Sequence, residues 1–123
     1  MDSNYKAELE AMGVDVDSAL GRFLNNEKMY MRFLLKFLDD KSLALLESSI
    51  AEDKLKDAFL YAHNMKGLTA NLGINSLSEI LTPMVEQLRR GETTCLSQAL
   101  PKLQATYDEV CVLIKKMKPD IAK

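Results

Sequence analysis

Residues 61–73 read YAHNMKGLTANLG, and this stretch decides how the chain folds. Its apolar and small side chains recur at the spacing of one face of an α-helix. Gly73 is well placed to end that helix in a left-handed conformation. Inside the helix stands Gly67, which costs about 1 kcal/mol relative to alanine. One turn before it lies His63, the only histidine of the chain. The loss of helix stability at Gly67 indicates that the absence of a side chain beside His63 serves a function.

An ideal helix, with 100° per residue, places His63 outside the apolar face. Gly67 lies about 40° from it and one turn along, and Ala70 about 20° from it and two turns along. Lys66 lies about 60° away, toward the edge of the core face. The imidazole is therefore expected on an open face with almost no side-chain bulk after it. The expected core face consists of Ala58, Ala62, Met65, Leu68, Thr69 and Leu72, with Tyr61 beside them.

The rest of the chain also has helical periodicity, and no segment alternates like a β-strand. Asn26 is a good N-cap for a helix whose expected core stripe is Met29, Phe33, Leu34 and Phe37. Ser76 and Glu79 are spaced as a capping box that starts the helix after Gly73. Short connections between amphipathic helices favour antiparallel neighbours, so the sequence predicts an all-α helical bundle. The expected helices cover residues 5–12, 15–24, 27–38, 42–50, 53–72, 76–90 and 95–117.

Composition narrows the class of protein. The 123 residues suggest a single domain, with 47% hydrophobic and 28% charged residues. A net charge of −2 provides no overall basic field for a nucleic acid. Cys95 and Cys111 would lie about 24 Å apart on one helix, too far for a disulfide. With no signal peptide and no transmembrane segment, we expect a soluble, cytoplasmic monomer. Met1 and the lack of a linker at either end favour a complete protein over a fragment.

The surroundings of His63 suit one kind of chemistry. An imidazole that is neutral at pH 7 is a nucleophile, and a nearby ammonium can stabilise an anion held on it. Phosphoryl transfer needs in-line positioning and charge compensation of this kind. Each residue also has an ordinary explanation. His63 can be a surface histidine, Lys66 a solvated lysine, and Gly67 the site of a close helix contact. The residues alone leave the two interpretations open.

The motif resembles the histidine-containing phosphotransfer (HPt) domain family, whose pattern is A-H-x-[LM]-K-G followed by small residues and L-G. The matching positions are Ala62, His63, Met65, Lys66, Gly67, Ala70, Leu72 and Gly73. The segments at 13–38 and 76–92 also resemble the helices that precede and follow the histidine helix in this family, so the likeness covers nearly the whole chain.

The resemblance implies an antiparallel four-helix bundle with extra short N-terminal helices. It would be a single domain over residues 1–123, with its core bundle at about 26–118. It also implies a phosphorelay intermediate of two-component signal transduction, without kinase activity of its own. His63 would accept a phosphoryl group, most simply through Nε2, from a receiver-domain aspartate and pass it to another receiver. Lys66 would stabilise the phosphoryl group, while Gly67 and Ala70 would provide clearance for the partner.

The resemblance also bears on partners and cofactors. The partners would be receiver domains of response regulators or hybrid sensor histidine kinases, and no nucleic acid or membrane is expected. No cofactor or metal is expected on this chain, because Mg²⁺ would come with the receiver. Phe59, Leu60 and Asn64 are a possible docking surface, although packing against a neighbouring helix would also explain the first two.

One position departs from the family pattern. Many members place a Gln or Glu on the next helix facing the histidine, and here that position is Val85. Its neighbours Glu86 and Gln87 are alternatives for a contact with the ring.

Two other functions stay open at this point. A non-catalytic helical adaptor would bind a receiver or sensor kinase without phosphotransfer. A metal-assisted enzyme is disfavoured, because one histidine without a carboxylate cluster provides no ligand set.

Overall fold

A computed structural model describes residues 1–121, and these form seven α-helices and no β-strand, which confirms the all-α class. The connections are short, so most of the described chain is helical. The helices are α1 (Ser3–Ala11), α2 (Val16–Arg22), α3 (Glu27–Phe37), α4 (Ser42–Ala51), α5 (Leu55–Asn71), α6 (Asn75–Arg89) and α7 (Leu96–Ile121).

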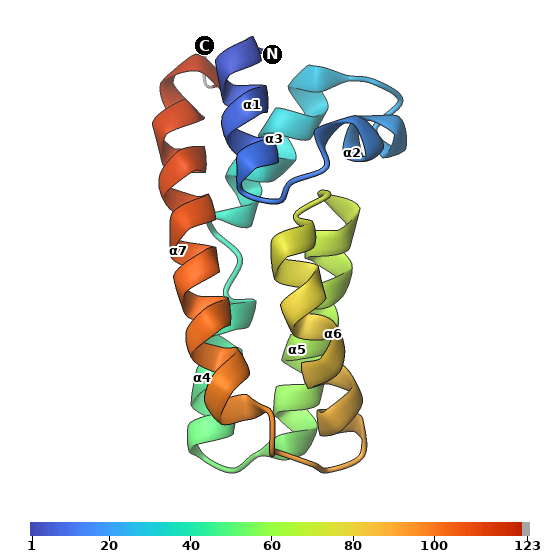
Figure 1. Cartoon of the computed structure of the whole chain (residues 1–123), viewed down its shortest axis with the longest axis vertical. Helices are drawn as coiled ribbons and strands as arrows, with labels where there is room; N and C mark the ends of the chain where they lie inside the picture. Colours follow the sequence, from blue (N-terminus) through green and yellow to red (C-terminus); the bar gives the residue numbers. More distant parts are fainter. Residues whose placement is uncertain (122–123) are drawn as a thin grey trace.

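The helices form a four-column antiparallel bundle with two extra helices at one end (Figure 1). The long helix α7 spans the length of the molecule, and α5 and α6 lie beside each other as an antiparallel pair. The fourth column consists of α3 and α4, stacked end to end with a break at residues 38–41. The short helices α1 and α2 lie at the end where α5 turns into α6. This arrangement confirms the predicted four-helix bundle with extra N-terminal helices.

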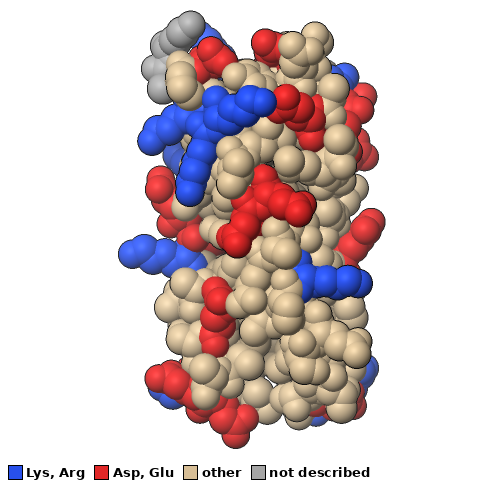
Figure 2. Space-filling view, turned by 60° about the vertical axis from the view of Figure 1, so that its left-hand side comes forward, with Lys and Arg blue, Asp and Glu red and all other residues tan. Residues whose placement is uncertain are grey.

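The surface carries both signs of charge. In Figure 2, basic and acidic side chains are interspersed over the upper part of the visible face, and the lower part is mostly uncharged. No continuous basic surface crosses this face, as expected for a net charge of −2. No helix within residues 1–121 combines the length and the hydropathy needed to cross a membrane.

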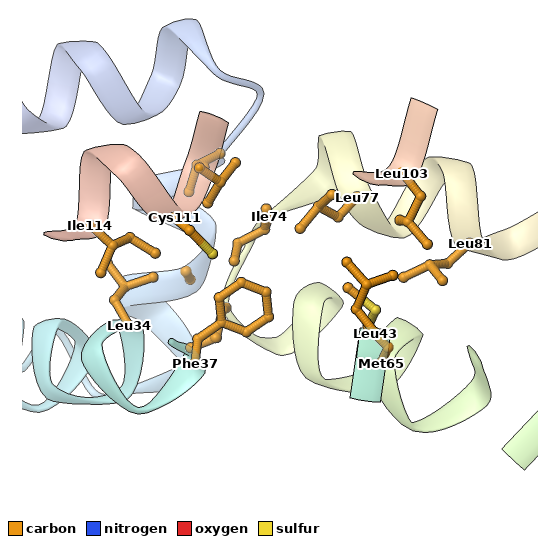
Figure 3. Close-up of a cluster of buried hydrophobic side chains, with 14 of the residues drawn as sticks. Leu34, Phe37, Leu43, Met65, Ile74, Leu77, Leu81, Leu103, Cys111 and Ile114 are labelled. Carbon is orange, nitrogen blue, oxygen red and sulfur yellow. The ribbon is translucent and has the colours of Figure 1, made fainter. Parts of the chain in front are cut away.

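The core runs along the bundle axis between the columns. Figure 3 shows Leu34 and Phe37 of α3 in one cluster with side chains of α7, among them Ile114. The predicted core stripe of α3 is partly wrong. Tyr30 is fully buried with Leu34 and Phe37, whereas Met29 is 43% exposed and Phe33 38% exposed. Positions i, i+4 and i+7 of this helix face the core, with Tyr30 directed to Leu72 at the end of α5 and Phe37 to Tyr107 of α7. The apolar residues beside them remain partly exposed.

The N-terminal segment is fixed to the turn between α5 and α6. Gly73 adopts φ +76°, as the sequence predicted, and its carbonyl accepts a hydrogen bond of 2.8 Å from the backbone N–H of Asp15. An isolated antiparallel bridge pairs Val14 with Ile74. The hydroxyl of Tyr30 is buried and donates to the carbonyl of Leu72 at 2.8 Å, and burial raises the pKa of Tyr30. The end of the histidine helix is therefore held by several long-range contacts.

The predicted capping box at Ser76 and Glu79 is wrong. Helix α6 begins at Asn75, with Ile74 at the N-cap and no side-chain capping bond. The backbone N–H of Ser76 instead donates to the carbonyl of Gly13 at 3.1 Å. The hydroxyl of Ser76 is buried without a hydrogen-bond partner within the described chain. The N-terminal loop thus takes the place of the local cap. At the start of α3 the prediction is correct, because the side chain of Asn26 accepts from the N–H of Met29 at 3.1 Å.

Candidate functional site

Helix α5 (Leu55–Asn71) is held between α4 and α6, and this position determines which side chains face solvent. One face is fully buried, with Ala58 and Ala62 at 0% exposure and Met65 at 1%. Thr69 is also buried, and its hydroxyl donates to the carbonyl of Lys66 at 3.1 Å. The predicted core face is confirmed, except that Leu68 is only partly buried. His63 is exposed on the opposite side, as predicted.

The surface beyond His63 is open. A Cβ atom built on Gly67 would meet no heavy atom within 4 Å, so this glycine does not serve a close contact between helices. That ordinary explanation for Gly67 is therefore wrong. Ala70 is also exposed, one turn further along the same face. The two small residues leave a shallow approach to the imidazole from the C-terminal side of the helix.

Two polar residues flank the histidine. Lys66 is half-buried, and within residues 1–121 no carboxylate forms an ion pair with it. Asn64 is exposed beside the ring. A lysine three residues from His63 lies on a neighbouring part of the helix surface, where a free ammonium can approach an anion held on the ring.

The imidazole has one aromatic neighbour. The ring of Phe59 lies one turn before His63, with the ring centroids 5.7 Å apart and the planes 24° from parallel. Phe59 is half-buried and packs against the core. The guanidinium of Arg89, on α6, lies over the Phe59 ring at 5.4 Å from its centroid. The sequence analysis missed Arg89, because the register between α5 and α6 is not visible in either segment alone.

Helix α6 offers no direct polar partner to the ring. Val85, at the departing position, is fully buried. Glu86 pairs with Arg89 at 3.6 Å. The side-chain oxygen of Gln87 accepts from the backbone N–H of Cys95 at 2.9 Å and from the hydroxyl of Thr94 at 3.1 Å. Neither candidate neighbour therefore bonds to His63 in the described chain.

The predicted docking residues fall into two groups. Leu60 is 53% exposed, and Asn64 is exposed beside it on α5. Phe59 is instead turned toward the histidine ring and the core. Leu60 and Asn64 are therefore exposed to solvent, whereas the ring of Phe59 is engaged by contacts within the chain.

The two cysteine thiols and the possible metal ligands differ from His63 as reactive groups. Cys95 and Cys111 are free thiols, as predicted, and burial raises the pKa of each. A raised pKa keeps the sulfur as a thiol, which is the less reactive form. Across residues 1–121, no group of three or more His, Cys, Asp or Glu side chains is arranged to hold a metal ion. The imidazole of His63, in contrast, is exposed to solvent.

Comparison with family models identifies the family of the chain. A family model described as "Hpt domain" matches residues 32–112, well over half of the chain. The match runs from within α3 to within α7 and includes all of α5, with His63, Lys66 and Gly67. Helices α1 and α2 lie outside it. No curated protein and no solved structure matches the chain.

Proposed function

Because the chain belongs to the Hpt domain family, we propose that it is a phosphorelay intermediate of two-component signal transduction. His63 accepts a phosphoryl group from an aspartate of one receiver domain and passes it to another receiver. The observation that carries this proposal is the only histidine of the chain, exposed in mid-helix, with no atom within 4 Å of the side-chain position of Gly67.

The proposed transfer is a displacement at phosphorus. A lone pair of the imidazole, on Nε2 by the family resemblance, forms a bond to the phosphorus atom. The bond between phosphorus and the aspartyl oxygen breaks, and its electron pair leaves with the aspartate as a carboxylate. The other ring nitrogen keeps its proton. The second transfer runs in reverse, from the imidazole to the aspartate of the next receiver. Such a reaction depends on in-line positioning and on stabilisation of the transferred charge.

The neighbouring residues have distinct proposed roles. Lys66 stabilises the phosphoryl group, and its lack of an ion pair with any residue described leaves its ammonium available. Gly67 and Ala70 provide clearance, so that the active site of a receiver can approach the ring. Leu60 and Asn64 belong to the surface that the receiver covers.

The chain acts as a carrier and has no kinase activity of its own. Any Mg²⁺ that the transfer needs is bound by the receiver domain, as the family resemblance implies. The partners are receiver domains or a hybrid sensor histidine kinase, and the chain works with them in the cytoplasm as a monomer.

A transfer assay tests the proposal. The protein and its His63→Gln variant are incubated with a panel of receiver domains carrying a labelled aspartyl phosphate. We expect label on the wild type that is lost in acid and stable in base, and no label on the variant. Circular dichroism and thermal unfolding serve as controls, because a side chain this exposed should be replaceable without loss of the fold. Equal labelling of both proteins would rule out His63 as the acceptor.

The adaptor function predicts a different outcome. An adaptor would bind a receiver with an affinity that can be measured by calorimetry, yet neither the wild type nor His63→Gln would take up label. Binding together with labelling of the wild type alone would exclude the adaptor.

A further inference from the structure

The imidazole of His63 is held on one side by an aromatic ring. Phe59 and His63 are four residues apart on α5, so their side chains lie on the same face of the helix. Their ring centroids are 5.7 Å apart, at an angle of 24°. This is the geometry of offset stacking, which aromatic pairs prefer over a face-to-face sandwich.

Phe59 is itself fixed from two directions. It is half-buried, with its ring packed against the core. Arg89 reaches it from α6, with the guanidinium carbon 5.4 Å from the ring centroid. Arg89 in turn lies 3.6 Å from a carboxylate oxygen of Glu86. The Phe59 ring is therefore a rigid support at the edge of the core, whereas the histidine beside it projects into solvent.

Within the described chain, the stack with Phe59 is the one ring contact of the histidine. Among the side chains of residues 1–121, none forms a hydrogen bond or ion pair with the imidazole. Val85, on the facing helix, is buried and apolar. Gln87 directs its oxygen to the start of α7. The stack is therefore the contact that can limit rotation of the imidazole.

We propose that Phe59 is a positioning residue for His63, and this inference rests on the phosphocarrier role proposed above. The stack fixes the plane of the imidazole so that a ring nitrogen faces the incoming phosphorus atom. Arg89 contacts Phe59 from α6. Helix α6 therefore helps to orient the histidine through the side chains of Arg89 and Phe59. Phe59 is thus a support within the chain and not part of the surface that a partner covers.

The first measurement detects the stack without any phosphoryl transfer. Because the chain has a single histidine, its two imidazole carbon-bound protons give unambiguous signals in a ¹H–¹³C NMR spectrum. The ring current of Phe59 should displace these signals upfield. We expect Phe59→Leu to remove the displacement and Phe59→Tyr to keep it. Arg89→Gln should move the signals partway, whereas Arg90→Gln should leave them unchanged, because Arg90 pairs with Glu92 and not with the ring.

The second measurement separates positioning from docking. Phosphoramidate, a small phosphoryl donor, reaches the histidine without a docking surface. The donor reacts with its nitrogen already protonated. Its P–N bond breaks as the bond from phosphorus to the imidazole forms, and the nitrogen leaves as ammonia with the electron pair of the broken bond. Phe59→Leu should slow this labelling roughly three- to tenfold, the size expected for one aromatic pair. Phe59→Tyr should restore the wild-type rate, and Arg90→Gln should label normally.

Two results would overturn the inference. The first is unchanged imidazole signals in Phe59→Leu, with the helix content intact by circular dichroism. The second is a normal phosphoramidate rate in Phe59→Leu together with slow transfer from a receiver, which would make Phe59 a docking residue. Failure of the proposed function would look different, because the wild type itself would take label from no donor while its imidazole signals remained displaced.

Discussion

Gly67 lies within α5, and Gly73 lies six residues later, just after that helix ends. The two glycines differ in what surrounds them. At Gly73 the backbone is left-handed, with φ +76°, and an added Cβ would lie 2.6 Å from the carbonyl oxygen of Asp15. At Gly67 the backbone is helical, and an added Cβ would meet nothing within 4 Å. The first glycine is required by contacts inside the molecule. The second is required by nothing inside the described chain.

The difference separates two kinds of small residue that a sequence presents alike. A glycine crowded by its own chain contributes to the fold. A glycine in open space lowers the stability of its helix, and no contact within the folded protein compensates for that loss. The position of Gly67, one turn from His63, therefore indicates a requirement that arises outside the chain. Four substitutions test whether the two glycines differ in this way.

Gly73→Ala should have the largest effect, a loss of about 3 kcal/mol in the free energy of unfolding. The substitution adds strain at positive φ and forces Asp15 away from the turn, where the Cβ would overlap its carbonyl oxygen. Urea unfolding measures the loss. Gly91→Ala is the matched control, because Gly91 has φ +73° and open space around it, so it should show the strain alone, about 1 kcal/mol. Equal losses at both positions would mean that the contact with Asp15 contributes nothing.

Gly67→Gln should reduce the rate of transfer from a receiver on the order of tenfold or more, because a side chain would then fill the approach to the histidine. The fold should remain intact or become more stable. Gly21→Gln is the control, since Gly21 is also helical and open but lies on α2. A rapid mixing assay with a labelled receiver gives the rates. Transfer by Gly67→Gln at the wild-type rate would refute the clearance role.

Tyr30→Phe should cost about 1 kcal/mol at neutral pH, because it removes the buried hydrogen bond to the carbonyl of Leu72 near Gly73. The difference should depend on pH. Below pH 10 the tyrosine keeps its proton in both the folded and the unfolded chain. Above pH 10 the unfolded chain releases it, while burial holds the pKa of the folded protein higher, so the wild type loses stability as pH rises. The gap between wild type and variant should therefore narrow above pH 10 in urea unfolding, and a constant gap would contradict this account.

Gly67→Ala should have the smallest effect, a gain of about 0.5 to 1 kcal/mol in the free energy of unfolding. The methyl group meets no neighbour, so only the helix propensity changes. Transfer should fall far less than in Gly67→Gln, because a methyl group obstructs little. A thermal unfolding curve measures the gain. A loss of stability would show that some group does pack at this position.

Local signals were sufficient for much of the fold. Asn26 caps α3 and Gly73 ends α5 in a left-handed conformation, both as predicted, because each depends on residues within one turn. The open face around His63 followed from helix geometry alone. The roles of His63, Lys66 and Gly67 in phosphoryl transfer stay predictions until they are measured.

Long-range contacts explain what the sequence could not predict. The capping box at Ser76 failed because Gly13, more than sixty residues earlier, supplies the carbonyl that its N–H needs. Phe33 stays at the surface because its neighbour Leu34 takes the inward position. The approach of Arg89 to Phe59 depends on the register between two helices, which no single segment specifies.

Two of the hydrogen bonds that join the N-terminal segment to the α5–α6 turn are made by main-chain atoms alone. Asp15 donates to the carbonyl of Gly73, and Ser76 donates to the carbonyl of Gly13, in both cases through backbone N–H groups. Buried side chains of the same segment, among them Leu9, Val16 and Tyr30, complete the junction from the core side. The family match begins only at residue 32, so a chain cut to the matched residues would lose the cover over this end of the core.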